Sequence, residues 1–301
     1  MGQNVSDQKS NQLLEYAVDS LLKNFNPENK QIMKKLHFFK LMNLLDTRLK
    51  KQGIDIKYPS YWYKYGSYSE IRFLETIIPR FGNRYQRNDF IMPPYPARKS
   101  YNIEIKAKSI IDRTVRYLCE QFRYQDEYGL KAKKASYNLN SPYEFNTLFQ
   151  EYITTLNSES MPLFSRKEQL ETFLNKLLFS FPEKDFPELI DIHLEWDDTT
   201  RLILDCIPET ENRQQTLVIE LMDIFWDIYS KGVRIKHNWN IPPKIVEEWK
   251  ASYEEAISDS YKKIEDIRTG TILKSCETSE GEHKAVKKLM QKAYDISLQE
   301  Y

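Results

Sequence analysis

The sequence predicts a mostly α-helical protein, with a small winged-helix-like α+β domain over residues 1–100 followed by an all-helical body over residues 101–301. Apolar residues recur at spacings of three and four along most of the chain. Short aromatic or alternating stretches, typical of strands, occur in the first part. The proline-rich run NDFIMPPYPA at residues 88–97 forbids a helix and marks a domain edge near residue 100.

Residues 31–51 are predicted to form an amphipathic helix. Ile32, Leu36 and Phe39 recur at helical spacing, and the basic residues of the segment lie largely off that stripe. Gly53 supplies a helix stop. The predicted helix is therefore basic on one face and apolar on the other.

A short hairpin is expected after this helix. Residues 54–58 alternate apolar and polar and predict one strand, and the aromatic residues 61–65 suit a second. Gly66 allows the next turn.

A second helix is then expected, with Ser67 or Ser69 as its cap, running to about Arg80 and closed by Gly82. The resulting order of helix, hairpin and helix is the basis for the winged-helix prediction.

Beyond residue 100, the same apolar spacing predicts a series of helices, several of which begin with helix-start residues such as Ser-Pro or Pro-Pro. No tandem repeat of fixed period is found. The predicted helices cover residues 105–122, 142–156, 166–179, 187–206, 214–230, 243–267 and 282–298.

The net charge of zero conceals an asymmetry. Residues 31–136 carry 22 Lys and Arg against 10 Asp and Glu, whereas residues 137–301 carry 19 against 30. A basic segment attracts polyanions and an acidic one repels them, so we expect nucleic acid at the first half and a protein partner at the helical second half. The alternative is that the two halves only neutralise each other.

Ten basic side chains of the first half are the candidate phosphate contacts, because lysine and arginine neutralise the nucleic-acid backbone. If they bind it, affinity falls steeply with salt, and charge reversal at Lys50 and Lys51 weakens binding to every sequence. The candidates are Lys34, Lys35, Lys40, Lys50, Lys51, Lys64, Arg84, Arg87, Arg98 and Lys99.

The aromatic run after the first helix has two interpretations. Tyr61, Tyr63, Lys64 and Tyr65 could present rings and an ammonium group to unstacked bases. Alternatively, Trp62 and its neighbours anchor a small sheet, which is the usual role of aromatic residues in strands.

Residues 35–72 also carry a pattern found in known proteins. Lys35-Leu36, Leu41 and Leu44-Leu45 lie in the predicted helix, and the run WYKYGSYSE follows at residues 62–70. This segment resembles the N-terminal region of prokaryotic proteins related to the SocA/Panacea antitoxin domain and the YwgA group. It departs from their pattern at Ser67, where proline is usual, and lacks the second lysine of the helix motif. The resemblance implies a helical or winged-helix fold and an antitoxin or antiviral defence role.

An enzymatic alternative rests on Asp89, Glu104 and Lys106. A strand over residues 101–105 would place them in the Asp, Glu-x-Lys arrangement of Mg²⁺-dependent nucleases, in which carboxylates hold the metal and the lysine supports the attacking water. The tripeptide Glu-x-Lys is frequent in a chain this rich in both residues, so the arrangement could equally be part of a basic helical face.

The acidic stretch at residues 191–198 contains several residue types that can bind a metal. On a strand, His193, Glu195 and Asp197 would share one face, whereas on a helix Asp191, Glu195 and Asp198 would do so. The apolar spacing around Trp196 favours the helix, with a solvated or partner-docking acidic face. We therefore expect no metal here.

Other sequence features exclude several classes of protein. No apolar run approaches the ~18 to 20 residues of a membrane span, and no glycine-rich phosphate loop or paired-cysteine motif occurs, so we expect no cofactor and no membrane partner. Cys119, Cys206 and Cys276 are expected to be reduced thiols of a cytoplasmic protein.

Three functions follow from these patterns. The first is a non-enzymatic module that binds nucleic acid through its basic half and a protein through its helical half, within a prokaryotic defence or toxin–antitoxin system. The second is the Mg²⁺-dependent nuclease. The third is a protein–protein bridging subunit that touches no nucleic acid.

Overall fold

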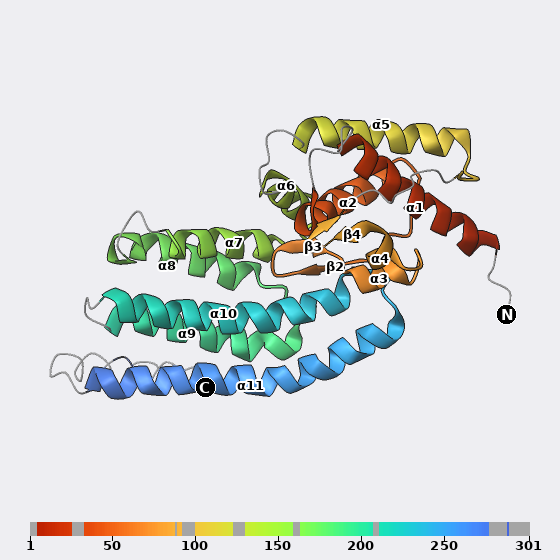
Figure 1. Cartoon of the computed structure of the whole chain (residues 1–301). Helices are drawn as coiled ribbons and strands as arrows, with labels where there is room; N and C mark the ends of the chain where they lie inside the picture. Colours follow the sequence, from red (N-terminus) through yellow and green to blue (C-terminus); the bar gives the residue numbers. More distant parts are fainter. Residues whose placement is uncertain are drawn as a thin grey trace. The chain divides into compact units, whose positions relative to one another are not determined.

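The structure, a computed structural model, describes residues 5–25, 33–87, 89–91, 100–122, 130–158, 163–206, 211–276 and 288. These residues form eleven α-helices, one short 3-10 helix and six short strands, which confirms the mostly helical prediction (Figure 1). The chain divides into two compact units. Unit 1 comprises residues 1–141 and 233–249, and unit 2 comprises residues 142–232 and 250–301.

Unit 1 contains all the strands, in two antiparallel three-stranded sheets of order β1-β5-β4 and β3-β2-β6. In the second sheet, Tyr61 pairs with Tyr68 and Ser60 pairs with Trp239. The elements are α1 (Val5–Phe25), β1 (Met33–Lys34), α2 (Lys35–Lys50), β2 (Ser60–Tyr63), β3 (Gly66–Tyr68), α3 (Ile71–Glu75), α4 (Phe81–Tyr85), β4 (Gln86–Arg87), β5 (Phe90–Ile91), α5 (Ile105–Phe122), α6 (Leu130–Asn140) and β6 (Asn238–Trp239).

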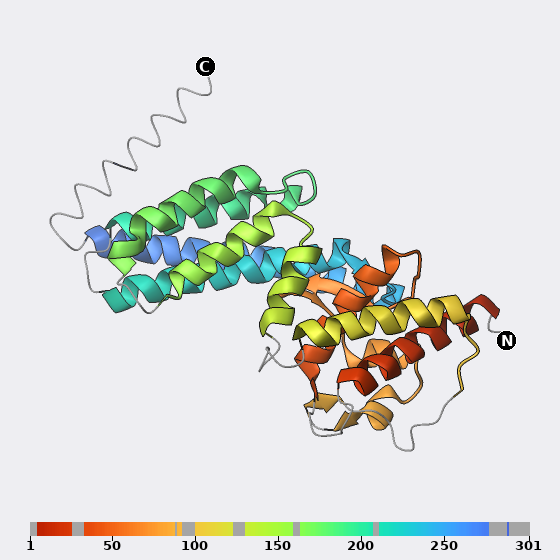
Figure 2. The same ribbon diagram turned by 90° about the horizontal axis from the view of Figure 1, so that it is seen from above.

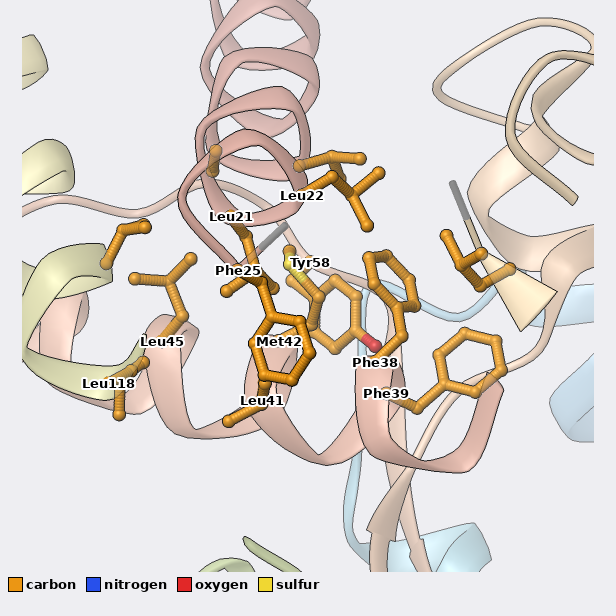
Figure 3. Close-up of a cluster of buried hydrophobic side chains, with 14 of the residues drawn as sticks. Leu21, Leu22, Phe25, Phe38, Phe39, Leu41, Met42, Leu45, Tyr58 and Leu118 are labelled. Atoms are coloured by element: carbon orange, nitrogen blue, oxygen red, sulfur yellow. The ribbon is translucent and has the colours of Figure 1, made fainter. Parts of the chain in front are cut away.

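Helix α2 lies at the centre of unit 1. Every residue from His37 to Asp46 is buried, so the helix is covered on all sides rather than on one face. α5 packs on both α1 and α2, and α6 packs on α2; α1 and α5 lie side by side in both ribbon views (Figure 2). The core side chains drawn in Figure 3 include Leu21, Leu22, Phe25, Phe38, Phe39, Leu41, Met42, Leu45, Tyr58 and Leu118.

This packing moves the edge of the first unit beyond the predicted boundary. Helices α5 and α6 follow residue 100 but bury their apolar faces against the N-terminal helices, so unit 1 runs on to Ser141. It also includes residues 233–249, which carry β6. A strand partner this distant in sequence leaves no trace in the local apolar pattern.

The predicted strand at residues 54–58 is wrong. The segment has no regular structure, and Lys57 adopts a positive φ of 54° while its backbone N–H donates to Asp55 Oδ1. Ile56 and Tyr58 are buried and Lys57 is exposed. The alternation of apolar and polar residues therefore reflects alternating burial in an irregular segment, not a strand. The hairpin instead joins β2 to β3, with the turn at Lys64 and Tyr65.

The single helix predicted to run to Arg80 is also wrong. Two short helices, α3 and α4, replace it, and the first begins after Glu70 rather than after a serine cap. Pro79 interrupts the segment and Arg80 has a left-handed φ of 60°. Gly82 lies inside α4 instead of closing a helix.

Unit 2 is built from helices that run side by side in both views (Figures 1 and 2). The predicted helices between residues 142 and 267 are confirmed, with altered ends, and the one at 282–298 lies outside the described residues apart from residue 288. The elements are α7 (Glu144–Leu156), α8 (Leu163–Ser180), the 3-10 helix Pro187–Leu189, α9 (Ile190–Cys206), α10 (Glu211–Lys236) and α11 (Pro243–Cys276), of which residues 233–249 belong to unit 1.

The core of unit 2 is aromatic. Phe149 stacks on Trp226 with ring centroids 4.4 Å apart, and Phe225 stacks on Trp196 at 4.8 Å. His193 stacks on Phe181 at 4.3 Å, and burial lowers the pKa of its imidazole to about 3. His193 is therefore a neutral core residue.

The acidic stretch at residues 191–198 lies on α9, so the helical interpretation is confirmed. Its predicted face is only partly available to a partner, because Glu195 accepts a bond from Arg268 Nη1 at 2.5 Å while Asp191 is exposed. Asp197 is buried and pairs with Arg201 at 2.7 Å. No helix in the described ranges has the length and apolar character needed to cross a membrane.

Candidate nucleic-acid interface

The division into units sharpens the charge asymmetry of the sequence. Unit 1 carries 28 Lys and Arg against 16 Asp and Glu, a net charge of +12, and unit 2 carries 16 against 28, a net charge of −12. A surplus of this size produces a positive potential around unit 1 that attracts polyanions. The candidate interface therefore lies in unit 1.

The predicted phosphate contacts on α2 do not form one cluster. Lys34 and Lys35 lie at the start of the helix, and Lys50 and Lys51 lie at its end. With 16 residues, α2 is about 24 Å long at 1.5 Å per residue. The two pairs of lysines therefore lie on separate parts of the surface.

Lys40 is a structural lysine. Its side chain is 1% exposed, and its ammonium group donates to the backbone carbonyls of Tyr65 and Ser67, each at 2.7 Å. Burial, with a smaller contribution from Lys133, lowers the pKa of Lys40 to about 7. The side chain connects α2 to the hairpin turn and to β3, and its burial keeps it from contacting a phosphate.

Arg84 is also tied to a partner. Its guanidinium donates to the buried carboxylate of Glu15 at 2.7 Å, which neutralises its charge locally. Arg87 contributes its backbone to β4, and its side chain is not described. Arg98 and Lys99 lie outside the described residues.

The structure of the hairpin shows which of its aromatic residues are buried anchors and which are exposed. Trp62 is fully buried and packs edge-on against Tyr137 of α6 at 5.6 Å, so its role as an anchor is confirmed. Tyr61 is buried too and lies 4.9 Å from Trp249. Tyr65 is the exposed ring of the turn, and Lys133 lies 4.5 Å from its centroid.

A pocket of about 470 Å³ opens at the end of α2, and we call it the α2-end pocket. This volume is within the range of about 300 to 1,000 Å³ that holds small ligands. All of its lining residues belong to unit 1 and come from α2, the hairpin, the end of α6 and β6. They are Asn43, Asp46, Thr47, Lys50, Lys51, Ser60, Ser67, Asn140 and Trp239.

Trp239 lines this pocket. Its strand β6 pairs with Ser60 of β2, and Trp62 donates its backbone N–H to the carbonyl of His237 at 2.9 Å. On the other side, the Asn240 side chain donates to the carbonyl of Tyr58 at 3.2 Å. The segment is therefore fixed on the sheet, yet the Trp239 side chain is 40% exposed.

The charges of the pocket sum to one positive charge. Lys50 donates to Oδ2 of Asp46 at 2.7 Å, and Asp46 is buried. Lys51 is exposed and makes no ion pair within the described part of the chain. Arg113 of α5 is nearby, because its guanidinium donates to Gln52, the residue after Lys51, at 3.1 Å.

The pocket contains one buried and one half-buried polar side chain, Asp46 and Asn140. Oδ1 of Asp46 has no hydrogen-bond partner among the described residues, and burial raises the pKa of this carboxyl group despite the nearby Lys50. The side-chain amide of Asn140 lies 3.0 Å from Thr47 Oγ1. The pocket therefore offers fixed polar groups beside an aromatic face.

The nuclease residues are not organised as predicted. Residues 101–104 have no regular structure and α5 begins at residue 105, so the predicted strand is wrong. Asp89 lies in the turn between β4 and β5, and Glu104 and Lys106 are exposed. Within the described ranges, no three His, Cys, Asp or Glu side chains gather in a way that could hold a metal ion.

Lys50 and Lys51 of the candidate interface were predicted from the sequence, whereas Trp239, Asn140 and Arg113 were not. Trp239 is 188 positions after Lys51 and reaches the pocket only because β6 pairs with β2. A tryptophan between two asparagines in a short connection of two long helices was the one local signal. No protein-family model, curated protein or solved structure matches this chain.

Proposed function

We propose that this chain is a non-enzymatic module that binds nucleic acid through unit 1 and a protein partner through unit 2. The observation that carries the proposal is the separation of charge between the units, +12 against −12. Such a separation directs a polyanion to one unit and away from the other.

The surface at the end of α2 supports this proposal. Lys50, Lys51 and Arg113 supply cations there, and Trp239 and the α2-end pocket supply an aromatic face and a recess. Cations that meet phosphates and rings that meet bases are the two components of nucleic-acid recognition. The winged-helix interpretation of residues 1–100 stays part of the proposal, and the order of α2, β2 and β3 is what supports it.

The proposed biological setting rests on the resemblance of residues 35–72 to the SocA/Panacea and YwgA group. We propose on this basis a role within a prokaryotic defence or toxin–antitoxin system, and the three cysteines, expected to be reduced, support a cytoplasmic location. For unit 2, the surplus of carboxylates and the exposed Asp191 and Leu194 on α9 favour a partner with a basic, partly apolar surface.

Charge reversal of Lys51 and Arg113 together should weaken binding to nucleic acid by about tenfold or more at low salt and reduce the dependence of log affinity on log salt by about 0.7 to 0.9 per cation lost. Lys50 is not substituted, because its loss would leave the buried carboxylate of Asp46 without its ion-pair partner. The measurement is fluorescence anisotropy with labelled single-stranded and double-stranded DNA and RNA at two salt concentrations.

The matched control is charge reversal of Lys262 and Lys263, two exposed lysines on α11 in unit 2. This variant changes the net charge equally and should bind better than the Lys51 and Arg113 variant. Equal weakening by both variants would contradict the proposed location. If the wild-type protein binds no nucleic acid at low salt, the remaining interpretation is the protein–protein bridging subunit. Cleavage of the nucleic acid in the presence of Mg²⁺ would favour the nuclease.

A further inference from the structure

We propose that the α2-end pocket holds one unstacked nucleotide of a single strand, with its base on Trp239 and its phosphate at Lys51. This inference rests on the proposed function and adds to it the class of nucleic acid that is bound. It requires an aromatic face, a matching charge and room for a base, and the three are present in one place.

The aromatic face is the exposed ring of Trp239. Of the five tryptophans in the sequence, the other four are 7% exposed or less, so Trp239 is the one whose indole is held at the surface. Pairing of β6 with β2 and the bond from Asn240 to Tyr58 fix the backbone on both sides of it. A ring held in place loses little conformational entropy when a base stacks on it.

The charge of the pocket matches one phosphodiester. Asp46 offsets Lys50, which leaves the ammonium group of Lys51 as the surplus cation. Ser60, Ser67 and Asn140, which carry hydroxyl and amide groups, also line the pocket. Such groups are able to hydrogen-bond the edge of a base, and the volume of about 470 Å³ accommodates a nucleotide.

A duplex cannot use this site without rearrangement. Its bases are stacked on one another and paired, so placing one on Trp239 requires that base to be unpaired and extruded, which is unfavourable. A single strand presents bases that are already free to unstack. The site therefore predicts a preference for single-stranded nucleic acid.

The test is the affinity of wild-type, Trp239→Ala and Trp239→Phe proteins for a labelled single-stranded oligonucleotide and for the matching duplex. Trp239→Ala should weaken single-strand binding by about tenfold, the value of one stacked base, while duplex binding stays unchanged. Trp239→Phe, which keeps an aromatic face, should retain most of the single-strand affinity. Intrinsic tryptophan fluorescence should fall when the single strand binds to wild-type protein.

The outcomes separate this inference from the proposed function. If wild-type protein binds neither nucleic acid, the proposed function itself fails. If wild-type protein binds but Trp239→Ala retains the same single-strand affinity, or loses single-strand and duplex affinity equally, the pocket assignment is overturned and the proposed function stands. Binding of a free mononucleotide without any binding of the oligonucleotide would overturn the assignment to a strand.

Discussion

Replacing Lys40 with alanine should lower the unfolding free energy of unit 1 by about 3 kcal/mol. The substitution removes the donor shared by the carbonyls of Tyr65 and Ser67 and leaves a cavity beside α2. An unsatisfied buried carbonyl costs about 1 to 3 kcal/mol, and relief of the buried ammonium group offsets part of the total. Lys51→Ala, at the exposed C-cap of the same helix, should stay within about 0.5 kcal/mol of wild type.

Lys40 should also make the stability of unit 1 depend on pH. Its pKa is about 7 in the folded protein, below its ordinary value of 10.5, so between these values the unfolded chain binds more protons. The contribution of Lys40 to stability therefore rises with pH from about 7 upward, by at most about 1.4 kcal/mol per pH unit. Lys40→Met, which keeps the side-chain volume without the amine, should lack this rise.

Both effects are measurable through Cys119, which is buried in α5 of unit 1. Labelling of this thiol along a urea gradient, mapped by mass spectrometry, reports the unfolding of unit 1 alone. Equal stability of Lys40→Ala and wild-type protein, or a parallel pH dependence in Lys40→Met, would contradict the role assigned to Lys40.

Gly66→Ala should destabilise the hairpin by about 2 to 4 kcal/mol. Gly66 has a positive φ of 87°, which disfavours any side chain, and a Cβ there would lie 3.0 Å from Cδ2 and 3.3 Å from Cα of Tyr137. The hairpin and α6 would have to separate, which would also disturb Ser67 and Asn140 in the α2-end pocket.

Gly53→Ala is the matched control for this substitution. Gly53 has a similar positive φ of 78°, but a Cβ added there would meet no atom within 4 Å. Its cost, about 1 kcal/mol, isolates the backbone strain, and the excess cost of Gly66→Ala measures the close approach to α6. Equal losses for the two variants in the Cys119 labelling assay would show that this close approach does not matter.

The helices α2, α5 and α7 to α11 were predicted from apolar spacing because they bury long faces, as Phe145, Phe149, Tyr152 and Leu156 do along α7. The 21-residue helix α1 was not predicted, and neither were the short elements. Residues 54–58 alternate like a strand but make no ladder, and α6, with its lysine-rich sequence, carries too few apolar residues to stand out. In both segments tertiary packing, rather than local pattern, decides the structure.

The candidate site was predicted only in part, because tertiary packing also decides which residues form it. A charge count finds the basic unit, and Lys50 and Lys51 lie within a strongly helical segment whose end is marked by Gly53. Burial is what separates Lys40 from these two lysines, and a sequence does not reveal it for a lysine on a helix covered on all sides. Trp239 joins the site through strand pairing, which only the folded chain provides.

The most direct test of the account is photo-crosslinking of the full-length protein to a single-stranded oligonucleotide that carries a photoreactive base, followed by mass-spectrometric mapping. Crosslinks are expected at Trp239 and at the peptides that contain Lys50 and Lys51, and excess unlabelled single strand should suppress the Trp239 crosslink more strongly than the same excess of duplex. Crosslinks confined to unit 2 would contradict it.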